Sequence, residues 1–199
     1  MNLDPVALRQ LVEFGQERRG VEFKASTDWT TYASKFTKAI MAMANKRDGG
    51  VIIVGWDASA GAHGILPEHE STFDIDTIQP HVNRYAAPYV EVVLQPFEVA
   101  GTHFLAIGAE EFRDIPVICQ RDSTDGVLKR GRVYVRSFRT VETTEVQTPE
   151  DSRDLLELAT DKGVERFVRR AARVGVDVTQ GEAARSRQAF DEELRRALG

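Results

Sequence analysis

The chain has 199 residues, of which 42% are hydrophobic and 29% are charged, and its formal net charge is −5. This length fits one domain with room for a helical appendage, and the absence of any apolar run of about 20 residues argues against a membrane-spanning protein. The acidic balance disfavours nucleic-acid binding over the whole surface, so any such binding requires a local basic patch.

The N-terminus and the single cysteine predict a cytoplasmic protein. Residues 1–5 have neither the basic start nor the apolar stretch of a secretory signal. Cys119 cannot form an internal disulfide, and the sequence has no Cys/His cluster for structural zinc. We expect Cys119 to be a small buried strand residue.

The first third of the chain is predicted to alternate helices and strands. Asp4-Pro5 is typical of a capped helix start, and this first helix is expected to end before residue 20. Residues 21–24 alternate like a strand. Residues 32–45 have a helical period, and the continuous apolar run 51–56 indicates a central strand covered on both faces.

The rest of the chain adds a hairpin, short strands and a helical tail. The expected elements are a helix over residues 75–82, a hairpin of strands 89–99 and 102–107, strands 116–119 and 133–135, and helices from Pro149 onward, the last through Phe190, Leu194 and Leu198. We therefore predict an α+β fold with a mixed central sheet flanked by helices in residues 1–147, and a C-terminal helical extension in residues 148–199.

Charged side chains suited to phosphate chemistry lie near two of the predicted strands. Glu22 and Lys24 share one strand face, Glu17 lies at the approach to that strand, and Asp57 directly follows the central strand. Three carboxylates that meet could hold Mg²⁺ or Mn²⁺, which activates water for phosphodiester cleavage. The lysine would stabilise the phosphate charge. Spacing alone equally allows a solvated strand face, a surface glutamate and a turn aspartate.

Basic residues flank these carboxylates in the sequence and could contact phosphates. The predicted nucleic-acid-binding set is Arg18, Arg19, Lys38, Lys46, Arg47, Lys129, Arg130, Arg132, Arg136 and Arg139, with Lys24 and Lys35 beside it. Ordinary solubilising charges remain an alternative for the set, and Arg136 could instead pair with a carboxylate. Aromatic candidates for base stacking are Trp29, Trp56 and Tyr134, of which the last two are better explained as core residues.

The order of several motifs resembles the AlbA-like domain of the Schlafen family. These motifs are Val21-Glu22-Phe23-Lys24, Ala42-Met43-Ala44-Asn45, Gly49 to Gly55 followed by Asp57, and Gly131 to Arg136 followed by Thr140. The resemblance covers roughly residues 10–145 and implies an α+β domain that binds nucleic acid. In nuclease members, three acidic residues bind a divalent metal and the protein cuts RNA, tRNA in particular. By position, Glu17, Glu22 and Asp57 match those acidic residues, and Lys24 matches the family lysine.

The chain departs from the family pattern in three ways. The spacing from Asn45 to Gly49-Gly50 is one residue longer than usual, the zinc-binding cysteines of vertebrate members are absent, and a single lobe would need a homodimer to complete a groove. The leading hypothesis is a metal-dependent endoribonuclease acting on structured RNA such as tRNA, with RNA preferred to DNA.

The alternative is a non-catalytic DNA- or RNA-binding module, or a nucleotide-binding regulatory module. The nucleotide-binding reading lacks a Gly-x-x-x-x-Gly-Lys-Ser/Thr loop. Whether the protein is an enzyme is left open by the sequence.

Overall fold

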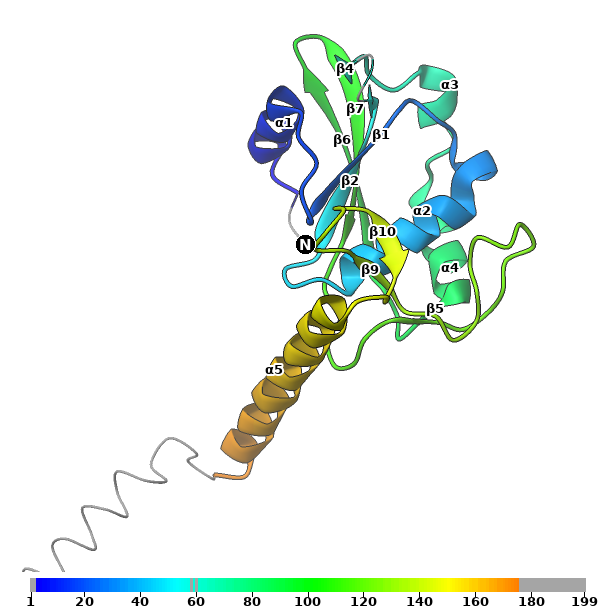
Figure 1. Ribbon diagram of the computed structural model, residues 1–199. Helices are drawn as coiled ribbons and strands as arrows, with labels where there is room; N and C mark the ends of the chain where they lie inside the picture. The colour runs from blue at the N-terminus through cyan, green and yellow to red at the C-terminus, as the bar shows by residue number, and fades with distance from the viewer. Residues whose placement is uncertain (1–2, 58, 60, 176–199) are drawn as a thin grey trace, which may run out of the picture. The chain divides into compact units, whose positions relative to one another are not determined.

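The computed structural model describes residues 3–57, 59 and 61–175 (Figure 1). The elements in chain order are α1 (Pro5–Phe14), β1 (Val21–Lys24), α2 (Trp29–Ala44), β2 (Gly50–Val54), β3 (Trp56–Asp57), β4 (Gly61–Ala62), α3 (Pro67–Glu70), α4 (Ile75–Tyr85), β5 (Ala86–Ala87), β6 (Val92–Val99), β7 (Thr102–Ala109), β8 (Ile118–Cys119), β9 (Tyr134–Arg136), β10 (Thr143–Glu145) and α5 (Pro149–Arg173). The predicted α+β class is confirmed.

The central sheet is mixed, as predicted. Its strand order is β1-β2-β7-β6, with β1 parallel to β2 and the other neighbours antiparallel. The strands β6 and β7 form the expected hairpin, and Pro96 lies within β6 at the edge of the sheet. Among the described residues, three further two-stranded ladders pair β3 with β4, β5 with β8, and β9 with β10.

Helices cover both faces of the sheet (Figure 1). On one face, α1 packs against the sheet in a core formed by Leu8, Val12, Val21, Phe23, Val51, Ile53, Phe97, Phe104 and Ala106. On the other face, α2 and α4 build the larger core with Ile52, Val54, Leu105 and Ile107. Because strand side chains alternate between faces, Glu22 and Lys24 share one face, as the sequence predicts, and that face is opposite α1.

Local capping and backbone geometry explain where two elements end. The Asp4 side chain accepts hydrogen bonds from the backbone N–H groups of Val6 and Ala7, which starts α1, and Gly15 ends it with φ of 59°. The central strand is shorter than the predicted run 51–56, because Gly55 has φ of 111°. A side chain at Gly55 would lie 2.6 Å from the backbone of Gly64. The chain therefore turns at this glycine before Asp57.

The C-terminal part contains the 25-residue helix α5 in place of several shorter helices. The chain divides into two units, residues 1–159 and 160–199. The expected division into a domain over residues 1–147 and a C-terminal helical extension stays a prediction. The helix predicted through Phe190, Leu194 and Leu198 lies outside the described residues. None of the helices in the described ranges is long and apolar enough to cross a bilayer.

Candidate functional site

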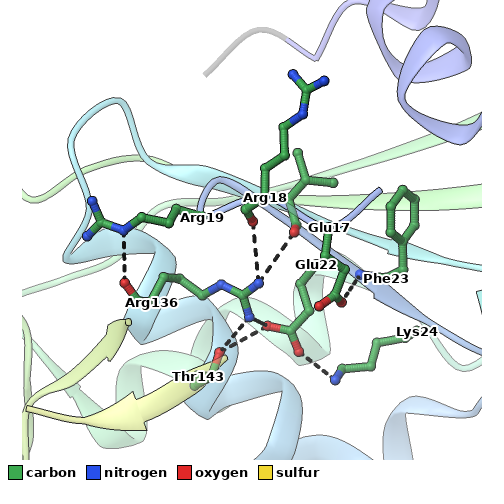
Figure 2. A network of polar contacts seen from close by, with 9 residues as sticks. Glu17, Arg18, Arg19, Glu22, Phe23, Lys24, Arg136 and Thr143 are labelled. Carbon is green, nitrogen blue, oxygen red and sulfur yellow. Dashed lines mark hydrogen bonds and ion pairs between the residues drawn. The ribbon is translucent and has the colours of Figure 1, made fainter. Parts of the chain in front are cut away.

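Glu22 lies in a buried ion-pair network at the edge strand β1 (Figure 2). Its Oε2 is 2.5 Å from Nη1 of Arg136 in β9, and its Oε1 is 2.5 Å from Nζ of Lys24. Thr143 in β10 donates a hydrogen bond of 3.0 Å to Oε2. The side chains of Arg136 and Glu22 are only 1% and 6% exposed, whereas that of Lys24 is 38% exposed. Glu22 is therefore a paired internal carboxylate, and of its two cationic partners Lys24 is the one that reaches solvent.

Arg136 ties the β9–β10 hairpin to the beginning of β1. Its Nη2 donates to the backbone oxygens of Arg18 and Val21, each at 3.4 Å (Figure 2). Burial lowers the pKa of Arg136, while the carboxylates of Glu22 and Glu17 act in the opposite direction. Since arginine keeps its proton in proteins, the guanidinium is a fixed positive charge near both predicted glutamates.

Glu17 is exposed and supplies a hydrogen-bond partner at the β1 edge. Its Oε1 accepts from the backbone N–H of Phe23 at 3.0 Å (Figure 2). Together with the bond from Arg136 to Val21 O, this gives two outward-facing backbone groups of β1 a side-chain partner. The arrangement supplies a structural role for Glu17, which the sequence placed in a metal site.

Asp57 is the second residue of β3, beyond the central strand, and pairs with Gly61 of β4. Its Oδ1 accepts from the backbone N–H of Ser59 at 2.8 Å and from the Ser59 hydroxyl at 2.6 Å. Within residues 3–57, 59 and 61–175, no three His, Cys, Asp or Glu side chains form a group that could hold a metal ion. In this arrangement Glu17, Glu22 and Asp57 do not fit a shared ion, and binding of Mg²⁺ or Mn²⁺ stays a prediction.

The predicted basic residues differ widely in what they contact. Arg136 follows the alternative given for it, because its buried guanidinium pairs with the carboxylate of Glu22 and does not face a phosphate at the surface. Several others are engaged: Lys38 lies 5.1 Å from the Tyr134 ring centre, Arg132 pairs with Glu145 at 3.4 Å, and Arg139 pairs with Glu150 at 3.6 Å. Lys129, Arg130 and Arg47 are exposed. Their role in binding stays a prediction.

Two adjacent arginines each stack on a half-exposed phenylalanine. The guanidinium of Arg18 lies 4.7 Å from the ring centre of Phe14, and that of Arg19 lies 3.4 Å from the ring centre of Phe138. The two phenylalanines are 56% and 50% exposed. Arg19 also pairs with Asp154 at 2.6 Å. Arg18 and Arg19 extend in different directions (Figure 2), and their separate contacts involve α1, the approach to β1 and the segment after β9.

Lys46 adds a third cation to this group. Burial lowers its pKa, and the nearby positive charge of Arg19 lowers it further. We call Phe14, Arg18, Arg19, Lys46 and Phe138 the arginine–phenylalanine surface. The sequence predicted its cations but missed its aromatic residues, although Phe14 lies off the buried positions Leu8 and Val12 of α1.

The aromatic residues chosen from the sequence lie elsewhere. Trp29 is 2% exposed and Tyr134 is fully buried, so neither is available to stack on a base, which corrects the expectation for Trp29. Trp56 packs with its ring centre 4.5 Å from that of Phe23. Its role in the core agrees with the preferred interpretation.

Comparison with known families agrees with the order of motifs in the sequence. The family model described as Schlafen, AlbA_2 matches residues 17–145. The chain belongs to the Schlafen AlbA_2 family. The matched residues include the whole Glu22–Arg136 network. Among curated proteins, none matches the chain significantly.

Two solved structures are similar to this Schlafen AlbA_2 chain. The DIP2311 protein from Corynebacterium diphtheriae has 18% identity and a TM-score of 0.49, over 75% of this chain and 28% of that chain. The N-terminal domain of a RecG-related protein from Nitrosomonas europaea has 15% identity and a TM-score of 0.38, over 74% of this chain and 85% of that one. The chain thus spans less than a third of the Corynebacterium protein's length.

The Schlafen AlbA_2 domain therefore places Glu17, Glu22 and Lys24 close to one another, whereas Asp57 makes its contacts elsewhere. Glu17 and Glu22 both lie near Arg136, with Lys24 on the outer side of Glu22. Asp57, in β3, accepts hydrogen bonds from Ser59. What this geometry offers a ligand is the exposed Arg18 and the partly buried Arg19, each beside an aromatic ring. The homodimer expected from the sequence stays a prediction.

Proposed function

We propose that this protein binds nucleic acid through the arginine–phenylalanine surface. The observation that carries the proposal is the pair of neighbouring arginines, Arg18 and Arg19, each lying over a half-exposed phenylalanine. Guanidinium groups match the geometry of phosphates, and exposed rings stack on bases. Membership of the Schlafen AlbA_2 family supports the same class of ligand.

The preferred ligand is RNA with unpaired bases. Unstacked bases can reach half-exposed rings such as Phe14 and Phe138, whereas bases inside a duplex cannot. The resemblance of the chain to RNA-cutting Schlafen proteins favours RNA over DNA. Because the net charge is −5 and Arg19 already pairs with Asp154, we expect moderate affinity that falls as salt rises.

Fluorescence anisotropy with labelled single-stranded RNA, single-stranded DNA and duplex RNA tests this proposal. Arg18→Gln and Phe138→Ala should each weaken binding to single-stranded RNA about fivefold or more. Arg113→Gln is the matched control, because Arg113 is exposed and pairs with Glu91 outside this surface. Equal affinities for the two test variants, the control and the unaltered protein would refute the proposed surface.

Non-catalytic binding is the function that this geometry supports best. Metal-dependent cleavage of structured RNA such as tRNA is the further step that the family resemblance implies. It would require Glu22 to leave Arg136 or Lys24, since each of its oxygens now faces one of these cations. We therefore expect RNA to bind without added metal and to remain intact.

An RNA-cleavage assay with Mn²⁺ or Mg²⁺ separates the two functions. The protein would be a metal-dependent enzyme, and not only a binding module, if the unaltered protein cut RNA and Asp57→Asn did not, while both had the same melting temperature. Asp57 suits this test because it is only half-buried. Replacing Glu22 would instead disturb the buried network.

A further inference from the structure

A cavity of about 320 Å³ opens where β1 ends and α2 begins. Its lining includes Lys24, Ser26, Tyr32, Lys35 and Phe36. This volume lies at the lower end of the range of about 300–1,000 Å³ that small-molecule sites occupy. It suits a ligand no larger than one nucleotide unit, and the residues around it suggest which chemistry such a ligand carries.

The cavity carries excess positive charge. Lys24 faces Glu22 but shares that carboxylate with the buried Arg136, which also has Glu17 nearby. Lys35 lies 5.0 Å from the Tyr32 ring centre and has no carboxylate partner among the described residues. An anion in the cavity would therefore meet two lysines whose charges are not fully neutralised.

Aromatic and polar groups give the cavity a defined shape. Helix α2 is kinked at Tyr32, whose φ of −113° and ψ of 16° are not helical, and this residue is 38% exposed. The neighbouring Phe36 is 1% exposed and contributes an apolar surface. Ser26 is held in place, because its Oγ accepts from the backbone N–H of Leu66 at 2.8 Å and lies 2.8 Å from Nδ1 of His69.

We propose that this cavity binds a single nucleotide, with its phosphate between Lys24 and Lys35 and its base against Tyr32. A monophosphate is attracted by the lysines, and a planar base gains stacking energy on an exposed tyrosine. The nucleotide is either free or the phosphorylated end of a bound strand. The strand-end case rests on the proposed nucleic-acid binding, whereas the free-nucleotide case is independent of it.

Isothermal titration calorimetry with AMP, adenosine and inorganic phosphate tests the site. AMP should bind more tightly than adenosine or phosphate, because it engages both the lysines and the ring. Lys35→Gln should weaken AMP binding about tenfold, and Tyr32→Leu at least fivefold. Arg113→Gln, which changes an exposed arginine outside the cavity that pairs with Glu91, should leave AMP affinity unchanged. The inference would be overturned if AMP failed to bind, or if both cavity variants bound AMP as tightly as the unaltered protein does.

Oligonucleotides distinguish the two sources of the nucleotide. The binding of 5′-phosphorylated RNA of about eight nucleotides is compared with that of the same RNA without the phosphate. If the protein prefers the phosphorylated RNA, and Lys35→Gln abolishes this preference, the ligand is a strand end. Cavity-dependent AMP binding without that preference identifies a free nucleotide. AMP binding without any RNA binding would refute the proposed function alone, and RNA binding without AMP binding would refute the cavity site alone.

Discussion

Replacing Arg136 with methionine should substantially destabilise the domain without changing its fold. Methionine keeps an unbranched side chain of similar reach but removes the charge that faces Glu22 at 2.5 Å. Breaking a buried ion pair from one side costs about 3–5 kcal/mol, because the remaining charge is left in a poorly solvated place. Here Lys24 and Thr143 still contact the carboxylate, and the buried Nε of Arg136 has no hydrogen-bond partner to lose. We therefore expect the lower end, about 3 kcal/mol.

Urea denaturation followed by circular dichroism measures this loss, and the melting temperature should fall by about 6–12 °C for a unit of this size. Arg132→Met is the matched control, since Arg132 is exposed and its partner Glu145 lies at 3.4 Å. That change should alter stability by less than about 0.5 kcal/mol. In a double-mutant cycle with Glu22→Gln, the coupling should be at least about 2 kcal/mol. A loss below about 1 kcal/mol in Arg136→Met would refute the reasoning.

Three further outcomes are expected. Gly55→Ala should destabilise the protein by more than about 2 kcal/mol in urea melts, because the φ of Gly55 is positive and the new Cβ would meet the backbone of Gly64. Gly61→Ala is the control, because Gly61 also has a positive φ but open space around it. A similar loss of stability in Gly61→Ala would contradict this reasoning. Burial lowers the pKa of His81 below 6.5, so the folded state binds the proton less readily than the unfolded state does. The stability of the protein should therefore fall as the pH drops below about 6.5. In His81→Phe, the melting temperatures at pH 7.5 and pH 5.5 should differ less than they do in the unaltered protein. Burial raises the pKa of the Cys119 thiol, so a thiol-reactive dye should label the native protein far more slowly than the protein in urea, and equal rates would show an accessible thiol.

Much of the fold could be predicted because its signals are local. The Asp4-Pro5 start of α1, the alternation of β1 and the hairpin of β6 and β7 depend on neighbouring residues, and the structure contains all three. The end of β2 could not be read from the apolar run. Trp56 extends the apolar run because it packs against Phe23. The strand has already ended by then, because the chain turns at Gly55.

The candidate site was harder to predict because its contacts are distant in sequence. The alternation of β1 placed Glu22 and Lys24 on one face, but it could not show that the β9–β10 hairpin covers Glu22. Arg136 is 114 residues away, and an arginine at the end of a short strand looks the same whether it faces solvent or a carboxylate. The Arg19–Phe138 stack could not be predicted for the same reason, because the two residues come together only when the β9–β10 hairpin packs against the start of β1.

The way in which β1 is bounded has a consequence for self-association. The Phe23 N–H and the Val21 carbonyl, which face away from the sheet, already have Glu17 and Arg136 as partners. At the opposite border, Pro96 offers no N–H to an incoming strand. Intermolecular β-pairing, which drives fibril growth and strand-swapped dimers, is therefore disfavoured at both borders.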